Sequence, residues 1–213
     1  GFSILTNYTW SKTIDDQSSA NPFNRAVSRG LATEDVPHNF KFSNIWEVPK
    51  LTTGGPAGKL LNGWQVNAIL VWQSGFPFTV SSGRDNSFTG VGGDRADYIG
   101  GNAELSDSRP RGDKVRQWFD ATRFTVNAPG TFGNSGRNIL RGPKFFNTDM
   151  GVLKSTGITE RMNLQFRAEF FNIFNTPNFR LPNGNISSSQ RGLITAVVDD
   201  NQRIIQFGLK LLF

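Results

Sequence analysis

The stretch Arg203-Ile-Ile-Gln-Phe-Gly-Leu-Lys-Leu-Leu-Phe213 alternates between apolar and polar side chains. Successive side chains of a strand point to opposite faces, so this alternation predicts a strand with one apolar face. That face carries Ile205, Phe207, Leu209, Leu211 and Phe213. A strand of this kind can cross a bilayer within a closed barrel, and it can also be the last strand of a soluble sandwich.

Five further segments show the same alternation. They span residues 2–12, 39–48, 63–74, 144–155 and 161–175, and the sixth strand is 203–213. At about 10 to 14 residues they are long, because strands of soluble proteins usually have about 5 to 6. The sequence therefore predicts an all-β fold whose strands are long enough to cross a membrane.

Aromatic residues recur on the predicted apolar faces. Trp64 and Trp72 share one face of the third strand, roughly 27 Å apart at ~3.4 Å per residue. A strand tilt of ~40° reduces this to roughly 21 Å of depth, close to the ~25 Å apolar band between the aromatic girdles of transmembrane barrels. We therefore predict that Trp64 and Trp72, together with Tyr8 and Trp10 of the first strand, are girdle residues.

The connections between the strands alternate in length. Long segments, 13–38, 75–143 and 176–202, alternate with shorter ones, 49–62 and 156–159. This order is typical of outer-membrane barrels, which have short periplasmic turns and longer extracellular loops. It predicts a C-terminus on the periplasmic side. Segment 75–143 is too long for an unstructured loop in a compact domain.

Segment 75–143 therefore requires structure of its own. We expect 78–80 and 124–126 to form a short sheet and 117–120 to form a helical turn. Asp94 and Asp97 lie in a Gly-rich stretch without the spacing of a calcium-binding EF-hand. This pattern favours a turn capped by aspartate over a calcium site.

Composition excludes several classes of site. The chain has 213 residues, no cysteine and a single histidine, so it offers no disulfide and no thiolate site. His38 follows Pro37 in a predicted loop, and one histidine alone makes neither a metal site nor a triad plausible. The sequence gives no catalytic, cofactor-binding or metal-binding residues, and we expect no enzyme.

The net charge of +6 raises the possibility of nucleic-acid binding. The arginines of the loops are scattered over polar segments instead of lying on one face, so we expect them to be solvated and expect no nucleic-acid partner. They are Arg25, Arg29, Arg84, Arg95, Arg109, Arg111, Arg116, Arg137 and Arg141.

Five motifs resemble those of a known family, in the same order along the chain. They are Tyr8-Thr-Trp-Ser-Lys12, Asp35-Val-Pro-His38, residues 128–149 with Asn134-Ser-Gly-Arg-Asn-Ile-Leu-Arg-Gly-Pro143, residues 167–179 with Phe170-Phe-Asn-Ile-Phe-Asn-Thr-Pro-Asn-Phe179, and Gln206-Phe-Gly-Leu-Lys-Leu-Leu-Phe213. The whole set resembles TonB-dependent outer-membrane receptors of the Oar-like type, which often carry a carboxypeptidase-regulatory-like domain.

The resemblance implies that residues 1–213 are the C-terminal portion of an antiparallel β-barrel of about 22 strands, with the plug domain and the earlier strands absent. It implies energy-coupled uptake of a scarce nutrient. The implied partners are outer-membrane lipid, the barrel-assembly machinery, which would read the terminal strand as an insertion signal, and the TonB protein, acting through the plug. The alternative function is that of a soluble or surface-displayed β-rich binding module, such as an adhesin or a lectin-like domain.

Overall fold

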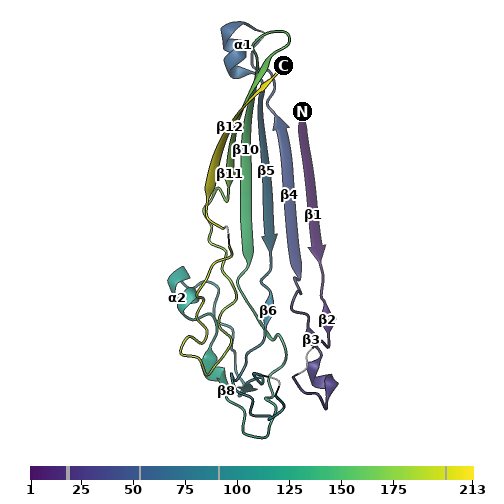
Figure 1. The fold of residues 1–213 in the computed structure, drawn as a ribbon, viewed down its shortest axis with the longest axis vertical. Coiled ribbons are helices and arrows are strands. Elements are labelled where there is room, and N and C mark those ends of the chain that lie inside the picture. Colours follow the sequence, from purple (N-terminus) through teal and green to yellow (C-terminus); the bar gives the residue numbers. More distant parts are fainter. Residues whose placement is uncertain (18–19, 53, 91, 200) are drawn as a thin grey trace.

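Six long strands form one antiparallel sheet in the computed structural model of this chain (Figure 1). The structure describes residues 1–17, 20–52, 54–90, 92–199 and 201–213. The strands are β1 (Phe2–Trp10), β4 (His38–Glu47), β5 (Trp64–Gln73), β10 (Phe145–Gly157), β11 (Asn163–Phe171) and β12 (Ile204–Leu212). Their order in the sheet is β1-β4-β5-β10-β11-β12, so each long strand pairs with the next one along the chain. The six predicted strands are confirmed.

The register keeps the predicted apolar faces on one side of the sheet. Tyr8 lies opposite Phe40, and Phe40 lies opposite Trp72. Trp72 in turn lies opposite Phe146. A shift of one residue in any pair would turn that strand's apolar residues to the other face. The alternation in each strand therefore agrees with its neighbours' alternation across the whole sheet.

Several strand boundaries differ from the prediction by one or two residues, and the end of the fifth strand differs most. The fifth strand was expected to reach Asn175 but ends at Phe171, because Asn172 adopts a left-handed φ of 47° and leaves the extended conformation. The Asn172 amide nitrogen Nδ2 donates to the carbonyl oxygens of Thr176 at 3.0 Å and Asn201 at 2.6 Å. The tight turn also begins later than expected, since β10 runs to Gly157 and the amide of Ile158 donates to the carbonyl of Met162.

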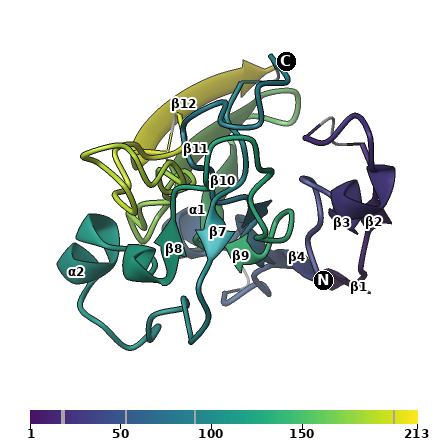
Figure 2. The ribbon, with the colours of Figure 1, turned by 90° about the horizontal axis from the view of Figure 1, so that it is seen from below.

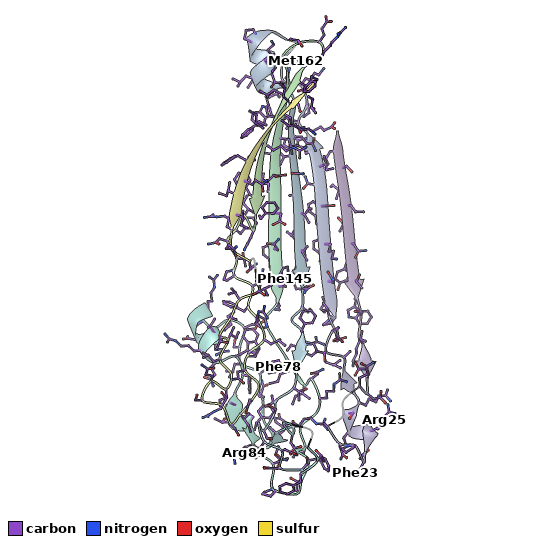
Figure 3. All side chains as sticks on the ribbon, viewed as in Figure 1. Phe23, Arg25, Phe78, Arg84, Phe145 and Met162 are labelled. Atoms are coloured by element: carbon purple, nitrogen blue, oxygen red, sulfur yellow. The ribbon has the colours of Figure 1, made fainter. Side chains whose placement is uncertain are left out.

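The two ends of the sheet differ strongly in size. One end carries the β10–β11 turn and a short helix, α1 (Gly55–Leu61), and we call it the short-turn end (Figure 1). The other end continues into three long connections, 11–37, 74–144 and 172–203, which we call the loop module. Figure 3 shows Met162 at the short-turn end and Phe23 and Arg84 at the far tip of the loop module. None of the described helices has the length and apolar composition needed to span a membrane.

The loop module is built from short elements, and in the view along the strands those of segment 11–37 lie to one side of those of segment 74–144 (Figure 2). Its described residues form α2 (Arg111–Arg116) and the 3₁₀ turns Arg25–Ser28 and Ala121–Arg123. Three two-stranded pairs join β2 (Ile14–Asp15) to β3 (Gly30–Leu31), β6 (Pro77–Phe78) to β9 (Leu140–Arg141), and β7 (Asp97–Tyr98) to β8 (Phe124–Thr125).

The expected pairing inside segment 75–143 is wrong in detail. The strands at Phe78 and Phe124 exist, but each pairs with a different partner instead of with the other. The helical turn expected at 117–120 is displaced to α2, and Asp120 instead caps the following 3₁₀ turn by accepting from the amide of Thr122. Phe78 and Phe124 nevertheless meet in one core, because the ring of Phe119 packs against both.

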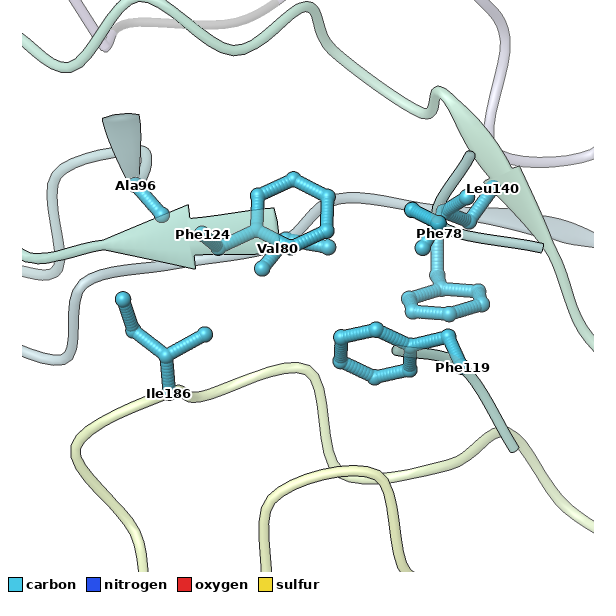
Figure 4. Packing of buried hydrophobic residues seen from close by; sticks show 8 residues of the cluster. Phe78, Val80, Ala96, Phe119, Phe124, Leu140 and Ile186 are labelled. Atoms are coloured by element: carbon cyan, nitrogen blue, oxygen red, sulfur yellow. The ribbon is translucent and has the colours of Figure 1, made fainter. Parts of the chain in front are cut away.

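The buried apolar core of the described residues lies in the loop module and not in the sheet. Figure 4 shows Phe78, Val80, Ala96, Phe119, Phe124, Leu140 and Ile186 converging from separate segments. Of the eleven buried apolar residues, Ala168 alone belongs to a long strand. A water-soluble sheet buries its apolar face against another layer, and no second layer covers the apolar face of this sheet among the described residues.

Candidate functional site

One face of the six-stranded sheet is apolar over nearly its full extent, and we call it the apolar face. Its apolar residues are Phe2, Ile4, Tyr8 and Trp10 in β1; Phe40, Phe42 and Trp46 in β4; Trp64, Val66, Ala68, Leu70 and Trp72 in β5; Phe146, Met150 and Val152 in β10; Leu164, Phe166, Ala168 and Phe170 in β11; and Ile205, Phe207, Leu209 and Leu211 in β12. Many of these side chains are not covered by other residues, and Trp10 and Phe207 are 75% and 68% exposed. A continuous apolar patch across six strands would be unusual on a soluble monomer, because contiguous apolar patches there rarely exceed a few hundred Å².

Among the described residues of the apolar face, Lys154 alone carries a full charge. Its ammonium group donates to the carbonyl oxygens of Asn62 at 2.6 Å and Ser155 at 3.1 Å. It also donates to the hydroxyl of Thr156 at 2.9 Å and lies 5.7 Å from the centre of the Trp64 ring. These contacts hold the ammonium group at the short-turn end, while the aliphatic part of the Lys154 side chain covers apolar surface.

Three of the four predicted girdle residues lie together at the loop-module end of the apolar face. The hydroxyl of Tyr8 lies 2.8 Å from Nδ1 of His38, and their rings stack with centroids 6.2 Å apart. Trp10 pairs with His38 across the strands, and the His38 ring lies 6.4 Å from that of Trp72. A row of rings thus crosses β1, β4 and β5.

His38 was predicted to lie in a loop, and that prediction is wrong. It is the first residue of β4, and its carbonyl oxygen accepts a 2.9 Å hydrogen bond from the amide of Ser74. The preceding Pro37 lacks an amide hydrogen, so it does not extend the ladder, but it does not prevent the next residue from starting the strand. Phe146 was not among the predicted girdle residues, although it lies directly opposite Trp72.

The fourth predicted girdle residue, Trp64, lies at the short-turn end. Its indole Nε1 donates to the carbonyl of Leu60 in α1 at 3.0 Å. Trp46 shares this end, opposite Phe2 on one side and Val66 on the other, and was not singled out from the sequence. Its alternation with Phe40 and Phe42 was the signal that could have identified it. The contact of all these rings with lipid headgroups stays a prediction.

The predicted insertion signal lies on β12 at the edge of the sheet. Ile205, Phe207, Leu209 and Leu211 lie opposite Phe170, Ala168, Phe166 and Leu164 of β11. The rings of Phe207 and Phe166 stack with centroids 6.2 Å apart. Phe213 lies beyond the last paired residue and is 98% exposed. The structure therefore groups the first four residues on one strand face and leaves Phe213 outside the ladder.

The opposite face, which we call the polar face, carries Lys41, Asp149, Arg167, Glu169 and Lys210. It also carries a few exposed apolar side chains, Leu5, Ile45 and Ile69. The Nε atom of Arg167 donates to Oε1 of Gln165 at 3.0 Å. Asp149 accepts from the side chain of Asn147 at 2.9 Å and from the backbone amide of Asn172 at 2.8 Å. This face combines charges of both signs with amides, as the wall of an aqueous interior would.

Three arginines expected to be solvated are instead substantially buried and fasten the loop module. Arg137 pairs with Asp15, and Arg141 pairs with Asp35. The guanidinium of Arg95 donates to the carbonyl of Val27 at 2.8 Å. Burial of Arg95 lowers the pKa of its guanidinium. Each contact joins segment 11–37 to segment 74–144, so the expectation of solvated arginines is wrong at these three positions.

Asp94 forms an aspartate-capped turn, as its surroundings suggested. Its carboxylate accepts from the backbone amide and the hydroxyl of Ser87, both at 2.7 Å, and from the amide of Asn127 at 3.1 Å. Burial alone would raise the pKa of Asp94, but these hydrogen bonds hold it below its ordinary value. The carboxylate of Asp97 instead accepts a hydrogen bond from the backbone amide of Asn134. No cluster of three or more metal-ligating side chains occurs among the described residues.

Comparison with known proteins gives one family. The model described as "Outer membrane beta barrel domain" matches residues 1–206, which is nearly the whole chain. Searches of curated proteins and of solved structures give no match.

Proposed function

This chain belongs to the outer membrane beta barrel domain family, and from that premise we propose that it forms the C-terminal part of the barrel of a TonB-dependent receptor. Family membership places the chain in the bacterial outer membrane, with lipid as the partner of its apolar face. We propose that the intact receptor takes up a scarce nutrient with energy supplied through TonB, and that it has no enzymatic activity. The observation that carries the proposal is the uncovered apolar face, continuous over six strands.

The open edges of the sheet support a larger barrel. The outer edges of β1 and β12 have no strand partner among the described residues. Unpaired backbone groups are not tolerated in the hydrocarbon region, because no water is present there to satisfy them. The sheet therefore needs further strands at both edges. We propose that these strands belong to the same polypeptide, and that its plug domain contacts TonB.

The family resemblance supports the more specific step to a TonB-dependent receptor. It rests on motifs at both ends of the chain and between them, including Tyr8-Thr-Trp-Ser-Lys12 and Gln206-Phe-Gly-Leu-Lys-Leu-Leu-Phe213. The long loop module agrees with a receptor whose large loops face the medium, which we propose as its orientation.

The alternative, a soluble or surface-displayed binding module, requires a second sheet over the apolar face. The described residues contain no such sheet, and the loop module lies beyond one end of the strands instead of over their face (Figure 1). The uncovered face therefore favours the barrel.

The test uses the protein isolated from outer membranes of its own cells. Peptide mapping should show that residues 1–213 are preceded by a plug domain in one polypeptide. Uptake of labelled nutrients is then compared in cells with and without the receptor, and with and without TonB. We expect receptor-dependent uptake that disappears without TonB. Uptake that persists without TonB would indicate a passive channel, and a polypeptide without a plug would indicate that other copies complete the barrel.

A further inference from the structure

A cavity of about 790 Å³ lies within the loop module, lined by residues of segments 74–144 and 172–203. Ser74 and Gly75, at the end of β5, and Pro143 and Lys144, just before β10, form its side toward the sheet. Helix α2 and the segment around Trp118 contribute the wall farther along segment 74–144. The cavity is thus built from segments far apart in sequence that meet where the strands leave the sheet.

Positive charge dominates the cavity wall. Five cationic side chains line it, against two carboxylates. The cations are Arg109, Arg111, Lys114, Arg141 and Lys144, and the carboxylates are Glu104 and Asp107. Two cations are already paired with acids, since Arg141 binds Asp35 and Lys144 lies 3.1 Å from Asp107.

Arg109 and Lys114 are held in place without being neutralised. The guanidinium of Arg109 donates to the carbonyl oxygens of Ser106 at 3.1 Å and Gln117 at 2.9 Å. Lys114 donates to the carbonyl oxygen of Asp107 at 2.9 Å. Carbonyl oxygens fix these side chains but carry no net charge, so the positive potential remains available to an anion. Cations held in advance lose less conformational freedom when an anion binds.

The remaining wall is apolar and includes a fixed indole. Trp118 donates through Nε1 to the carbonyl of Arg141 at 2.7 Å, which sets the position of its ring. Leu140, Phe179 and Ile194 also line the cavity. The cavity therefore offers a cationic part for an anionic group and an apolar part for the body attached to it.

We propose that this cavity binds a phosphate group joined to an apolar or aromatic body. Guanidinium and ammonium groups together suit phosphate, because it accepts several charge-assisted hydrogen bonds at once. Two kinds of ligand share this chemistry: an anionic lipid of the outer leaflet and a soluble organic phosphate.

The position of the cavity makes the lipid ligand reachable. Ser74 and Lys144 each lie two residues beyond Trp72 and Phe146, the facing aromatic residues at the loop-module end of the apolar face. If these rings lie at the headgroup level, the cavity opens next to lipid phosphates. Binding of a lipid phosphate depends on the proposed placement in the membrane, whereas binding of a soluble organic phosphate does not.

The test uses the full-length protein purified in detergent and reconstituted in nanodiscs. One variant combines Arg111→Gln with Lys114→Gln, and the matched control is Arg116→Gln, on the same helix but outside the cavity wall. In the first arm, native mass spectrometry counts phosphatidylglycerol retained from a mixture with phosphatidylcholine. In the second arm, calorimetry measures binding of 4-nitrophenyl phosphate and of inorganic phosphate. Heat-modifiable migration confirms that each variant is folded.

We expect the double variant to lose at least about tenfold in affinity for one of the two kinds of ligand, while Arg116→Gln changes little. Retention of phosphatidylglycerol alone would assign the lipid, and binding of 4-nitrophenyl phosphate would assign a soluble ligand. Binding of neither probe, or an equal loss in Arg116→Gln, would overturn the proposal. A receptor that binds phosphate at the cavity but shows no TonB-dependent uptake would disprove the proposed function alone.

Discussion

Asp35 and Arg141 form an ion pair between residues 106 apart in sequence, and it joins connection 11–37 to connection 74–144. The Asp35 side chain is fully buried, and its second carboxylate oxygen accepts from the backbone amide of Thr13 at 2.6 Å. Arg141 also donates to the carbonyl oxygens of Asp35 and Gly75, both at 3.2 Å. This one ion pair thus ties the connection after β1 to β9 and to the chain just beyond β5.

Replacing Asp35 with Asn should loosen the loop module. Removing one partner of a buried ion pair leaves the other uncompensated and costs about 3 kcal/mol. We expect faster hydrogen exchange in segments 11–17 and 137–142 of the full-length protein in detergent. Asp16→Asn is the matched control, because its pair with Arg25 is exposed and should contribute little. Equal exchange in both variants would contradict a structural role for the buried pair.

The contribution of Asp35 should also depend on pH. Burial alone would raise its pKa, but the hydrogen bond from Arg141, the Thr13 amide and the nearby positive charges hold it below the ordinary value. A group whose pKa is lowered by folding stabilises the folded state above its ordinary pKa of about 3.9, and this stabilisation is lost as the pH falls through the folded pKa. Exchange rates of wild type and Asp35→Asn should therefore converge only below about pH 4. A constant difference from pH 7 to pH 3 would contradict this.

Gly75 should not tolerate a side chain. A Cβ atom there would lie 1.9 Å from the carbonyl oxygen of Gly142, at the point where the chain leaves β5 beside the start of β10. The obstacle is backbone, so relief requires moving one of the two segments, at a cost of roughly 2–3 kcal/mol. Gly75→Ala should lower the temperature at which the heat-modifiable form is lost. Gly112→Ala, with no atom within 4 Å of the added carbon, should leave it unchanged.

The six long strands could be predicted because their information is local. Alternation with period two sets each strand and its two faces, and matching apolar faces then set the register between neighbours. The end of β11 could not be predicted, because it depends on one residue, Asn172, whose side chain bonds across the loop to Asn201. The alternation of apolar and polar residues around Asn172 does not indicate that contact.

The structure of the loop module could not be predicted from the sequence for a different reason. Its short strands have two residues each, too few to show a period, and their partners lie far along the chain. Arg95, Arg137 and Arg141 look solvated in sequence because their acceptors belong to segment 11–37. In the candidate site, the alternation correctly placed Tyr8, Trp10 and Trp72 on one face, whereas the contact of Tyr8 and Trp72 with His38 required the structure.

The orientation of the barrel can be tested with single cysteines, because residues 1–213 contain none. We expect Arg25→Cys, in the loop module, to react with a membrane-impermeant maleimide on intact cells. Glu160→Cys, in the β10–β11 turn, should react only after the outer membrane is permeabilised. Both positions are exposed, so a difference in labelling reports the side of the membrane. Labelling of Glu160→Cys alone on intact cells would reverse the topology.

The depth of the girdle residues can be measured by fluorescence. Variants that keep only Trp64 or only Trp72, with the other tryptophans replaced by Phe, are reconstituted with lipids brominated near the headgroup or deep in the chain. Tryptophan prefers the interface, so we expect the shallow bromines to quench both residues more strongly. Ala68→Trp, midway along β5, provides the contrast and should be quenched mainly by the deep bromines. Equal depth at all three positions would contradict the girdle assignment.

The last prediction concerns Phe213, taken as the final residue of the protein, which C-terminal peptide mapping checks first. Phe213 is almost fully exposed and lies outside β12, so its deletion should cost the folded barrel little. We therefore expect the deletion variant to refold into liposomes as well as wild type. In cells, where the assembly machinery is expected to read the terminal strand, the deletion should lower the heat-modifiable species several-fold, whereas Leu211→Ile should not. A defect in liposomes as large as that in cells would make Phe213 a structural residue. Normal assembly of the deletion variant in cells would leave β12 an ordinary amphipathic strand.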